Sequence, residues 1–149
     1  MQIPFPFVIL AAMVGGVVSV TPTVRADEKT VKAEKEWRVA SVERKDNDAW
    51  KEAPKNGVVA GPKAWAKLWK AWHGDAEVPK VDFEKEIILV AAGPGPNILK
   101  VGELKRSDKG NLKFEWSITE RGGDGFVATI VKVKREGVKT VNGEPLPKE

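Results

Sequence analysis

The residues that could carry out chemistry are few. In residues 27–149 the serines are Ser41, Ser107 and Ser117. A Ser–His–acid triad would have to use His73, the only histidine, and the G-x-S-x-G turn that presents a nucleophilic serine is missing. Carboxylates occur throughout the chain, so Glu120 and Asp124 beside a turn do not mark an acid–base pair. We predict no catalytic residue and no enzymatic activity. The alternative, a small hydrolase, would depend on His73.

Metal and cofactor chemistry is also poorly supported by the sequence. With one histidine and no cysteine, the chain cannot form a conventional zinc site. Asp46, Asn47, Asp48 and Asp124 offer oxygen atoms, but they lack the number and spacing of a calcium-binding loop. We therefore predict no metal and no cofactor, and interpret these residues as turn formers.

Six tryptophans are the next residues that could bind a ligand, because sugars stack on exposed indoles. They are Trp37, Trp50, Trp65, Trp69, Trp72 and Trp116. Periodicity points five of them inward, and burying an indole contributes about 3 kcal/mol or more to stability. Trp50 is the exception, because it lies in the polar, turn-rich segment 46–57. It carries our alternative functional prediction, a carbohydrate-binding module.

Three of these tryptophans belong to an expected helix over about residues 62–72. Its apolar residues recur at helical spacing: Trp65, Leu68, Trp69 and Trp72. Pro62 suits the first helical position, and Gly74 suits the residue after the helix. His73, at the C-terminal end, is expected to cap free carbonyl groups there.

The remainder reads as strands joined by short connections. Strand patterns cover 36–45, 86–92, 98–107, 112–120 and 126–136, with a short extended piece at 58–62. The segment 86–92 is apolar on both faces, as in the middle of a covered sheet. The segment 112–120 alternates, with Trp116 on its inward side. We predict an α+β fold: a mainly antiparallel, sandwich-like sheet with one amphipathic helix packed on it.

Two glycine-rich loops are the segments most suggestive of function. GPGPN, residues 93–97, is stiffened by two Gly-Pro pairs, and a stiff exposed loop loses little entropy on binding. RGGDG, residues 121–125, adds charged groups to a second turn. The residues predicted to contact a protein partner are Pro94, Gly95, Pro96, Asn97, Arg121 and Asp124. The alternative is that both loops are ordinary turns.

The first 26 residues differ from the rest. Residues 3–20 are uncharged and mostly apolar, and Val24 and Ala26 suit cleavage after Ala26. We predict a signal peptide over 1–26 and a periplasmic or extracellular protein, the alternative being a retained membrane anchor. Residues 27–36 are charged and are expected to form a flexible linker before one globular domain at 37–149.

The charge of the chain argues against a nucleic-acid partner. The net charge is +4, and without Arg25 the 24 basic and 21 acidic residues that remain give +3. Basic and acidic residues alternate, so there is no concentrated basic stripe for phosphates. After cleavage of the leader we expect no membrane association, and we expect a monomer whose partner is a protein.

The order of motifs resembles the PrcB C-terminal domain family, found in an accessory protein of a bacterial surface protease complex. W-x-x-L-W (Trp65, Leu68, Trp69) is followed by Pro79 and V-D-F (81–83), and the resemblance spans about 37–135. It implies the fold, export and a role in stabilising or inhibiting a protease. Where that family has a T-G-G-Y-like stretch, this chain has GPGPNIL, and it has no tyrosine. The end of the chain is similar to the ends of secreted proteins of planctomycete-like bacteria.

Overall fold

The computed structural model describes residues 27–148, so the signal peptide expected at 1–26 lies outside the described residues. The helical elements are α1 (Pro62–His73) and two short 3-10 helices, η1 (Arg44–Asp46) and η2 (Ala49–Glu52). The strands are β1 (Glu28–Thr30), β2 (Lys35–Ser41), β3 (Val58–Val59), β4 (Glu86–Pro94), β5 (Leu99–Val101), β6 (Lys105–Ser107), β7 (Asn111–Lys113), β8 (Trp116–Ile118), β9 (Phe126–Lys134), β10 (Thr140–Val141) and β11 (Glu144–Pro145).

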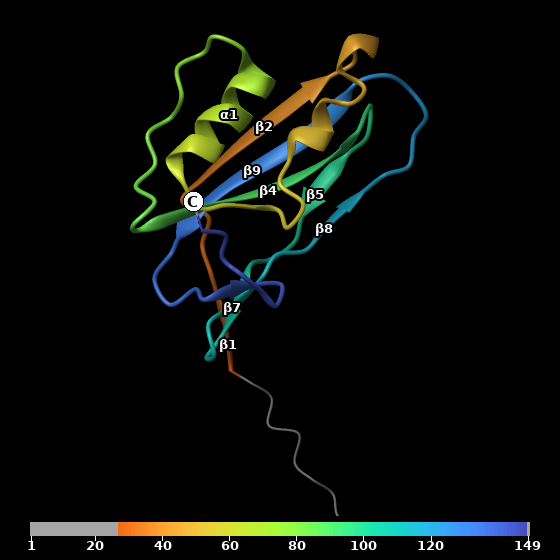
Figure 1. Cartoon of the computed structure of the whole chain (residues 1–149). Coiled ribbons are helices and arrows are strands. Elements are labelled where there is room, and N and C mark those ends of the chain that lie inside the picture. The colour runs from red at the N-terminus through yellow and green to blue at the C-terminus, as the bar shows by residue number, and fades with distance from the viewer. Residues whose placement is uncertain (1–26, 149) are drawn as a thin grey trace, which may run out of the picture.

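A four-stranded antiparallel sheet forms the centre of the molecule, in the order β2-β9-β4-β3 (Figure 1). β4 pairs with β9 along its whole length, from Glu86↔Lys134 to Pro94↔Phe126. Residues 87–93 of β4 are all buried, because structure covers both faces of the sheet. The prediction that residues 86–92 form a strand in the middle of a covered sheet is thus confirmed.

Helix α1 covers one face of this sheet (Figure 1). It begins with Pro62 at its first turn and ends at Gly74, whose φ of 60° lies in the left-handed region. Its apolar side packs onto Ile88, Val90 and Ile130 of the central strands. The predicted helix and its two end signals are confirmed to within one residue.

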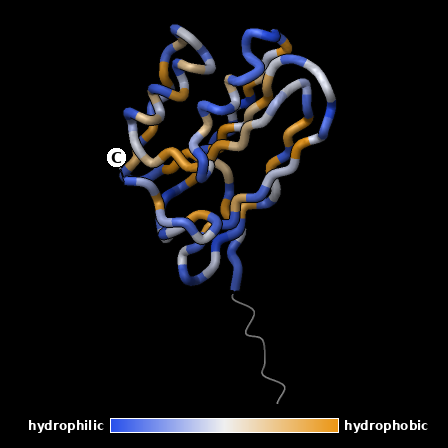
Figure 2. Tube along the Cα trace, turned by 45° about the vertical axis from the view of Figure 1, so that its right-hand side comes forward, coloured by the Kyte–Doolittle hydropathy of each residue, from blue (hydrophilic) through white to orange (hydrophobic). Residues whose placement is uncertain are grey.

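The opposite face is covered by two small sheets, which complete a third layer. One is ordered β1-β6-β7-β10-β11, and the other pairs β5 with β8. Their side chains pack on the second face of β4 and β9. In the Cα trace of Figure 2, apolar positions run through the middle of the molecule. The buried residues of this side include Ile87, Leu89, Val131, Val133, Leu104, Leu112, Phe114 and Val141. Only β7 and β10 pair in parallel among residues 27–148. The fold is therefore α+β and rich in antiparallel strands, as predicted.

Two predictions about the strands are corrected by the structure. Residues 27–36 are not a linker throughout, because β1 pairs with β6 and β2 begins at Lys35. Charged side chains suit a strand that is exposed on both faces, because the hydrogen bonds between strands are made by the backbone and do not require apolar side chains. The segments 98–107 and 112–120 each divide between two sheets. As a result Trp116 is 43% exposed instead of buried.

Within residues 27–148 no helix is long and apolar enough to cross a membrane.

Candidate functional site

The register of the central sheet brings the two predicted loops together. Both Ser41, at the end of β2, and Pro94, at the end of β4, are aligned with Phe126, the first residue of β9. The segments 42–48, 93–98 and 119–125 therefore meet at one end of the sheet, at the top of Figure 1. We call these three segments the loop end. A direct bond joins two of them, since the Gly95 N–H donates to the Gly125 carbonyl at 2.9 Å.

Asn97 fixes the arrangement of the GPGPN loop. Its Oδ1 accepts hydrogen bonds from the Thr119 hydroxyl at 3.2 Å and from the Arg121 N–H at 2.6 Å. Its Nδ2 donates to the Pro94 carbonyl at 2.7 Å. The Thr119 hydroxyl in turn accepts from the Ile98 N–H at 2.9 Å. Asn97, predicted to contact a partner, is thus occupied in holding the loop.

Asn47 has the same role between the first and third segments. Its Oδ1 accepts from the Gly125 N–H at 2.6 Å, and its Nδ2 donates to Asp124 Oδ1 at 2.9 Å. Asp124 is therefore held by its own chain. The sequence indicated Asn47 only as a turn former, because a contact across 78 positions leaves no local pattern.

Two glycines allow the segments to approach this closely. A Cβ on Gly123, whose φ is +146°, would lie 2.4 Å from Pro96 Cδ. A Cβ on Gly125, whose φ is +94°, would lie 1.8 Å from the Ser41 carbonyl oxygen. Gly122 differs from both, because a Cβ at that position would meet no other atom within 4 Å. The lack of a side chain thus lets Gly123 pack against the GPGPN loop and Gly125 pack against the end of β2.

The surface of the loop end combines apolar groups with charged groups of both signs. Val42 is 74% exposed and Ile98 is 46% exposed, and Trp116 is the third large hydrophobic residue so exposed in the described part of the chain. Pro96 and Arg121 belong to the same loops. The guanidinium group of Arg121 makes no hydrogen bond or ion pair with residues 27–148. Four of the six predicted contact residues are exposed, Asn97 is half-buried and Gly95 is buried. The exposed ones are Pro94, Pro96, Arg121 and Asp124.

Trp50 does not stand free in a loop as the carbohydrate alternative expected. It lies in η2 and is half-buried against a cluster formed by Ala92, Phe126 and Ala128. Trp50 and Trp116 nevertheless line the same hollow of about 610 Å³. The sequence did not reveal Trp116 as a lining residue, because the alternation of 112–120 concealed the change of sheet between β7 and β8.

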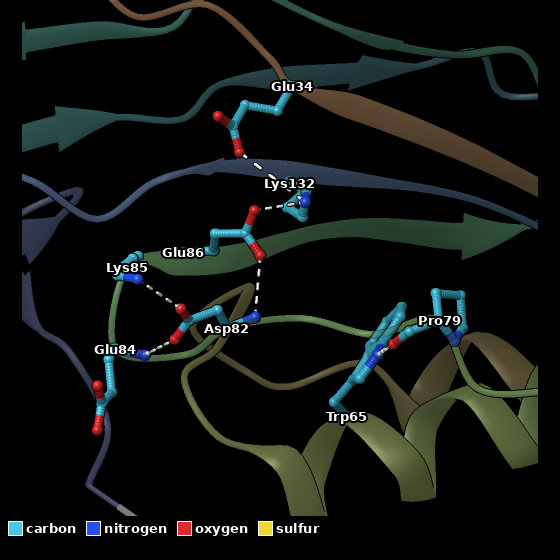
Figure 3. Close-up of polar contacts among 8 residues, drawn as sticks. All are labelled: Glu34, Trp65, Pro79, Asp82, Glu84, Lys85, Glu86 and Lys132. Carbon is cyan, nitrogen blue, oxygen red and sulfur yellow. Dashed lines mark hydrogen bonds and ion pairs between the residues drawn. The ribbon is translucent and has the colours of Figure 1, made fainter.

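The most closely associated charged groups hold strands together (Figure 3). Glu86 of β4 pairs with Lys132 of β9, and Lys132 also lies 3.9 Å from Glu34. Burial acts to raise the pKa of Glu86, but hydrogen bonds from Lys132 and from the Asp82 N–H, with the charge of Lys132, leave that pKa below its ordinary value. This arrangement stabilises the carboxylate, which is the opposite of preparing it as a general acid.

His73 lies against Trp69 of the same helix. The His73 ring stacks on Trp69 with 3.7 Å between ring centroids, and no hydrogen bond joins it to a serine within the described range. Burial lowers the pKa of His73, and the Trp69 carbonyl partly opposes this. Its Nδ1 is buried without a hydrogen bond to the described residues, so the expected capping role is not seen at that atom. No group of three potential metal ligands occurs among residues 27–148.

Comparisons with known proteins add no relative. No family model matches the chain, and neither a curated protein nor a solved structure matches it.

Proposed function

We propose that this protein is an exported, non-enzymatic module that binds another protein through its loop end. The observation that carries the proposal is the position of Val42 and Ile98, two of the three most exposed large hydrophobic side chains in the described part. Both lie beside loops that are fixed by hydrogen bonds. Exposed apolar groups on segments that meet at one end of a molecule are candidate contacts for a protein partner.

The hydrogen bonds of the loop end favour binding by a preformed surface. Asn97 joins the second segment to the third through bonds to Pro94 and Arg121. Asn47 joins the first segment to the third through bonds to Asp124 and Gly125. Side chains and loops that are already ordered lose less entropy when a partner binds. Arg121 adds a cation and the neighbouring Glu120 an anion, and neither has an ion pair within residues 27–148, so a partner surface with charges of both signs beside apolar groups would be complementary.

The resemblance to the PrcB C-terminal domain family makes a protease the first class of partner to test. The replacement of the T-G-G-Y-like stretch by GPGPNIL means that contact would be made by Pro94 and Pro96 instead of a tyrosine. Export rests on the leader at residues 1–26, and a monomer is proposed as the acting unit.

Site-specific photo-crosslinking tests this proposal. A photoreactive residue placed at Val42 in the full chain, expressed in the source cells, is expected to give a discrete adduct with one protein. The same residue at Asp108, in the hairpin between β6 and β7, is the matched control and is expected to give none. Arg121→Glu should abolish the Val42 adduct, and the captured protein should bind the purified chain.

Equal adducts from positions 42 and 108, or no adduct from either, would contradict the proposal. If the adduct forms and the captured protein is a protease, its peptidase activity is then measured with and without the purified chain. A change that Arg121→Glu removes is the expected result.

A further inference from the structure

The hollow lined by Trp50 and Trp116 is a second surface, apart from the loop end. Its floor is apolar and formed by Val90, Ala92, Phe114 and Val141, all buried. Its polar rim is formed by Lys51, Lys55, Asn56, Asn142 and Glu144. At about 610 Å³ it is within the range of small-ligand sites, roughly 300–1,000 Å³.

The edge of β4 opens into this hollow. The Val90 N–H donates to the Gly57 carbonyl at 2.8 Å, just before β3 begins, and the pairing of β3 with β4 goes no further along β4. Because strand groups alternate, the N–H and carbonyl of Ala92 point toward the same edge, where no described strand pairs with them. Two residues on, Pro94 has no N–H, so an added peptide strand could not continue the ladder. A short ligand suits this edge better than an extended peptide.

The polar rim leaves several groups for a neutral ligand. Asn142 is held in place, because it exchanges two 2.8 Å hydrogen bonds with the backbone of Phe114. Asn56 Oδ1 accepts from the Val58 N–H, which leaves its amide N–H groups as donors. The Glu144 carboxylate and the Lys55 ammonium have no ion pair within residues 27–148. The Glu144 carboxylate is an acceptor and the Lys55 ammonium is a donor. Hydroxyl groups can bond to both, whereas a phosphate would be repelled by the carboxylate.

We propose that this hollow binds a saccharide with a neutral pyranose ring. The C–H face of such a ring is apolar and stacks on an indole, while its hydroxyls both donate and accept hydrogen bonds. The Trp116 ring, 43% exposed, offers the stacking face. Ala92, Asn56 and Glu144 offer the polar groups around it. Rings with equatorial hydroxyls, as in glucose and N-acetylglucosamine, present the flattest apolar face.

Titration of the full chain with cellotriose and with chitotriose tests the proposal by calorimetry and tryptophan fluorescence. At least one sugar is expected to bind saturably with a Kd of about 1 mM or tighter. Trp116→Ala should weaken binding by about tenfold or more, since stacking on an aromatic ring is worth about that factor. Trp116→Phe keeps a ring and should stay within about threefold of wild type. Because Trp116 is exposed, neither change should alter the near-ultraviolet circular dichroism of the buried tryptophans substantially.

Two results would overturn the proposal: no saturable binding of either sugar up to about 10 mM, or binding that Trp116→Ala leaves unchanged. Val42→Ala, at the loop end, is the matched control and should bind sugar as wild type does. The Val42 photo-adduct does not depend on Trp116, so failure of this proposal and failure of protein binding are distinguishable.

Discussion

Trp65 and Trp69 are neighbours on helix α1 with very different polar environments. Both are buried, and their ring centroids lie 5.1 Å apart, with the Trp37 centroid 5.7 Å from the first and 5.9 Å from the second. The Trp65 Nε1–H donates to the Pro79 carbonyl at 2.9 Å (Figure 3). The Trp69 Nε1–H is buried and has no acceptor among the described residues. The same side chain thus satisfies its donor at one position and not at the other.

This difference predicts unequal costs for the same substitution. Trp65→Phe loses a hydrogen bond and leaves the Pro79 carbonyl without its donor, whereas Trp69→Phe removes a donor that has no acceptor. Both leave a similar void. We expect Trp65→Phe to lower the free energy of unfolding by about 1 kcal/mol more than Trp69→Phe, measured by urea denaturation. Equal losses would mean that packing alone determines the contribution of both indoles.

At the level of single residues, the sequence predicted burial where it could be read from helical spacing. Trp65, Leu68 and Trp69 are buried as expected, because a helix fixes its faces through local geometry. The prediction for Trp116 was wrong, since the face of a strand depends on which sheet it joins. Asn47 and Asn97 were recognised only as loop residues, because their bonds join positions far apart in the chain.

Among the elements, strands β4 and β9 are joined by side chains as well as by backbone. Glu86 and Lys132 form an ion pair across the two strands, and both side chains are only 18% exposed. Glu34, just before β2, lies at the other side of Lys132. This small network connects three adjacent segments of the central sheet (Figure 3).

Glu86→Gln should therefore destabilise the protein in a pH-dependent way. At pH 7 we expect a loss of about 1–2 kcal/mol, because a charged hydrogen bond is replaced by a neutral one. Folding lowers the pKa of Glu86 from its ordinary value of 4.5, so its contribution is complete above that value and is lost as pH falls through the lower pKa of the folded state. The difference from wild type should shrink below about pH 4, as thermal unfolding at several pH values would measure.

Glu84→Gln is the matched control for this experiment. Glu84 is exposed, and its backbone N–H donates a hydrogen bond to Asp82 (Figure 3). The substitution leaves that backbone bond in place, so the variant should unfold like wild type at every pH. A constant difference between wild type and Glu86→Gln across pH would indicate that the carboxylate charge of Glu86 does not contribute.

For the elements, local patterns predicted types better than partners. The apolar run at 86–92 was predicted as a strand covered on both faces, because that pattern depends on nearby residues. The parallel pairing of β7 with β10 was not predicted, since these strands are short and separated by β8 and β9. The edge strand β1 was missed because its three residues are all exposed and its composition resembles that of unstructured chain.

For the whole molecule, β1 attaches the start of the described chain to the small sheet. It pairs with β6 over three residues, and the Val31 N–H donates to the Leu104 carbonyl at 2.8 Å. Thr30 Oγ1 also donates to Glu103 at 3.0 Å, and Val31 packs against the core. A few residues later, β2 enters the central sheet, so one continuous segment joins two layers.

A chain that begins at Lys32 should be less stable than one that begins at Asp27. We expect a loss of about 1–2 kcal/mol, because one partly buried valine and a short ladder are removed. Hydrogen exchange at the amides of β6 should accelerate strongly. Exchange at the amides of β9 should accelerate only by the factor that the loss of global stability predicts. Equal stability of the two chains would restore the interpretation of 27–36 as a linker.

The attachment of β1 also determines how the protein is best immobilised. Figure 1 shows β1 at the end of the molecule opposite to the loop end. Coupling the chain to a sensor surface or bead through a residue placed before Glu28 would therefore direct Val42, Pro96 and Arg121 into solution. Coupling through a cysteine introduced at position 122 would cover the same groups with the support. Comparing partner binding in the two orientations would show which end of the molecule the partner contacts.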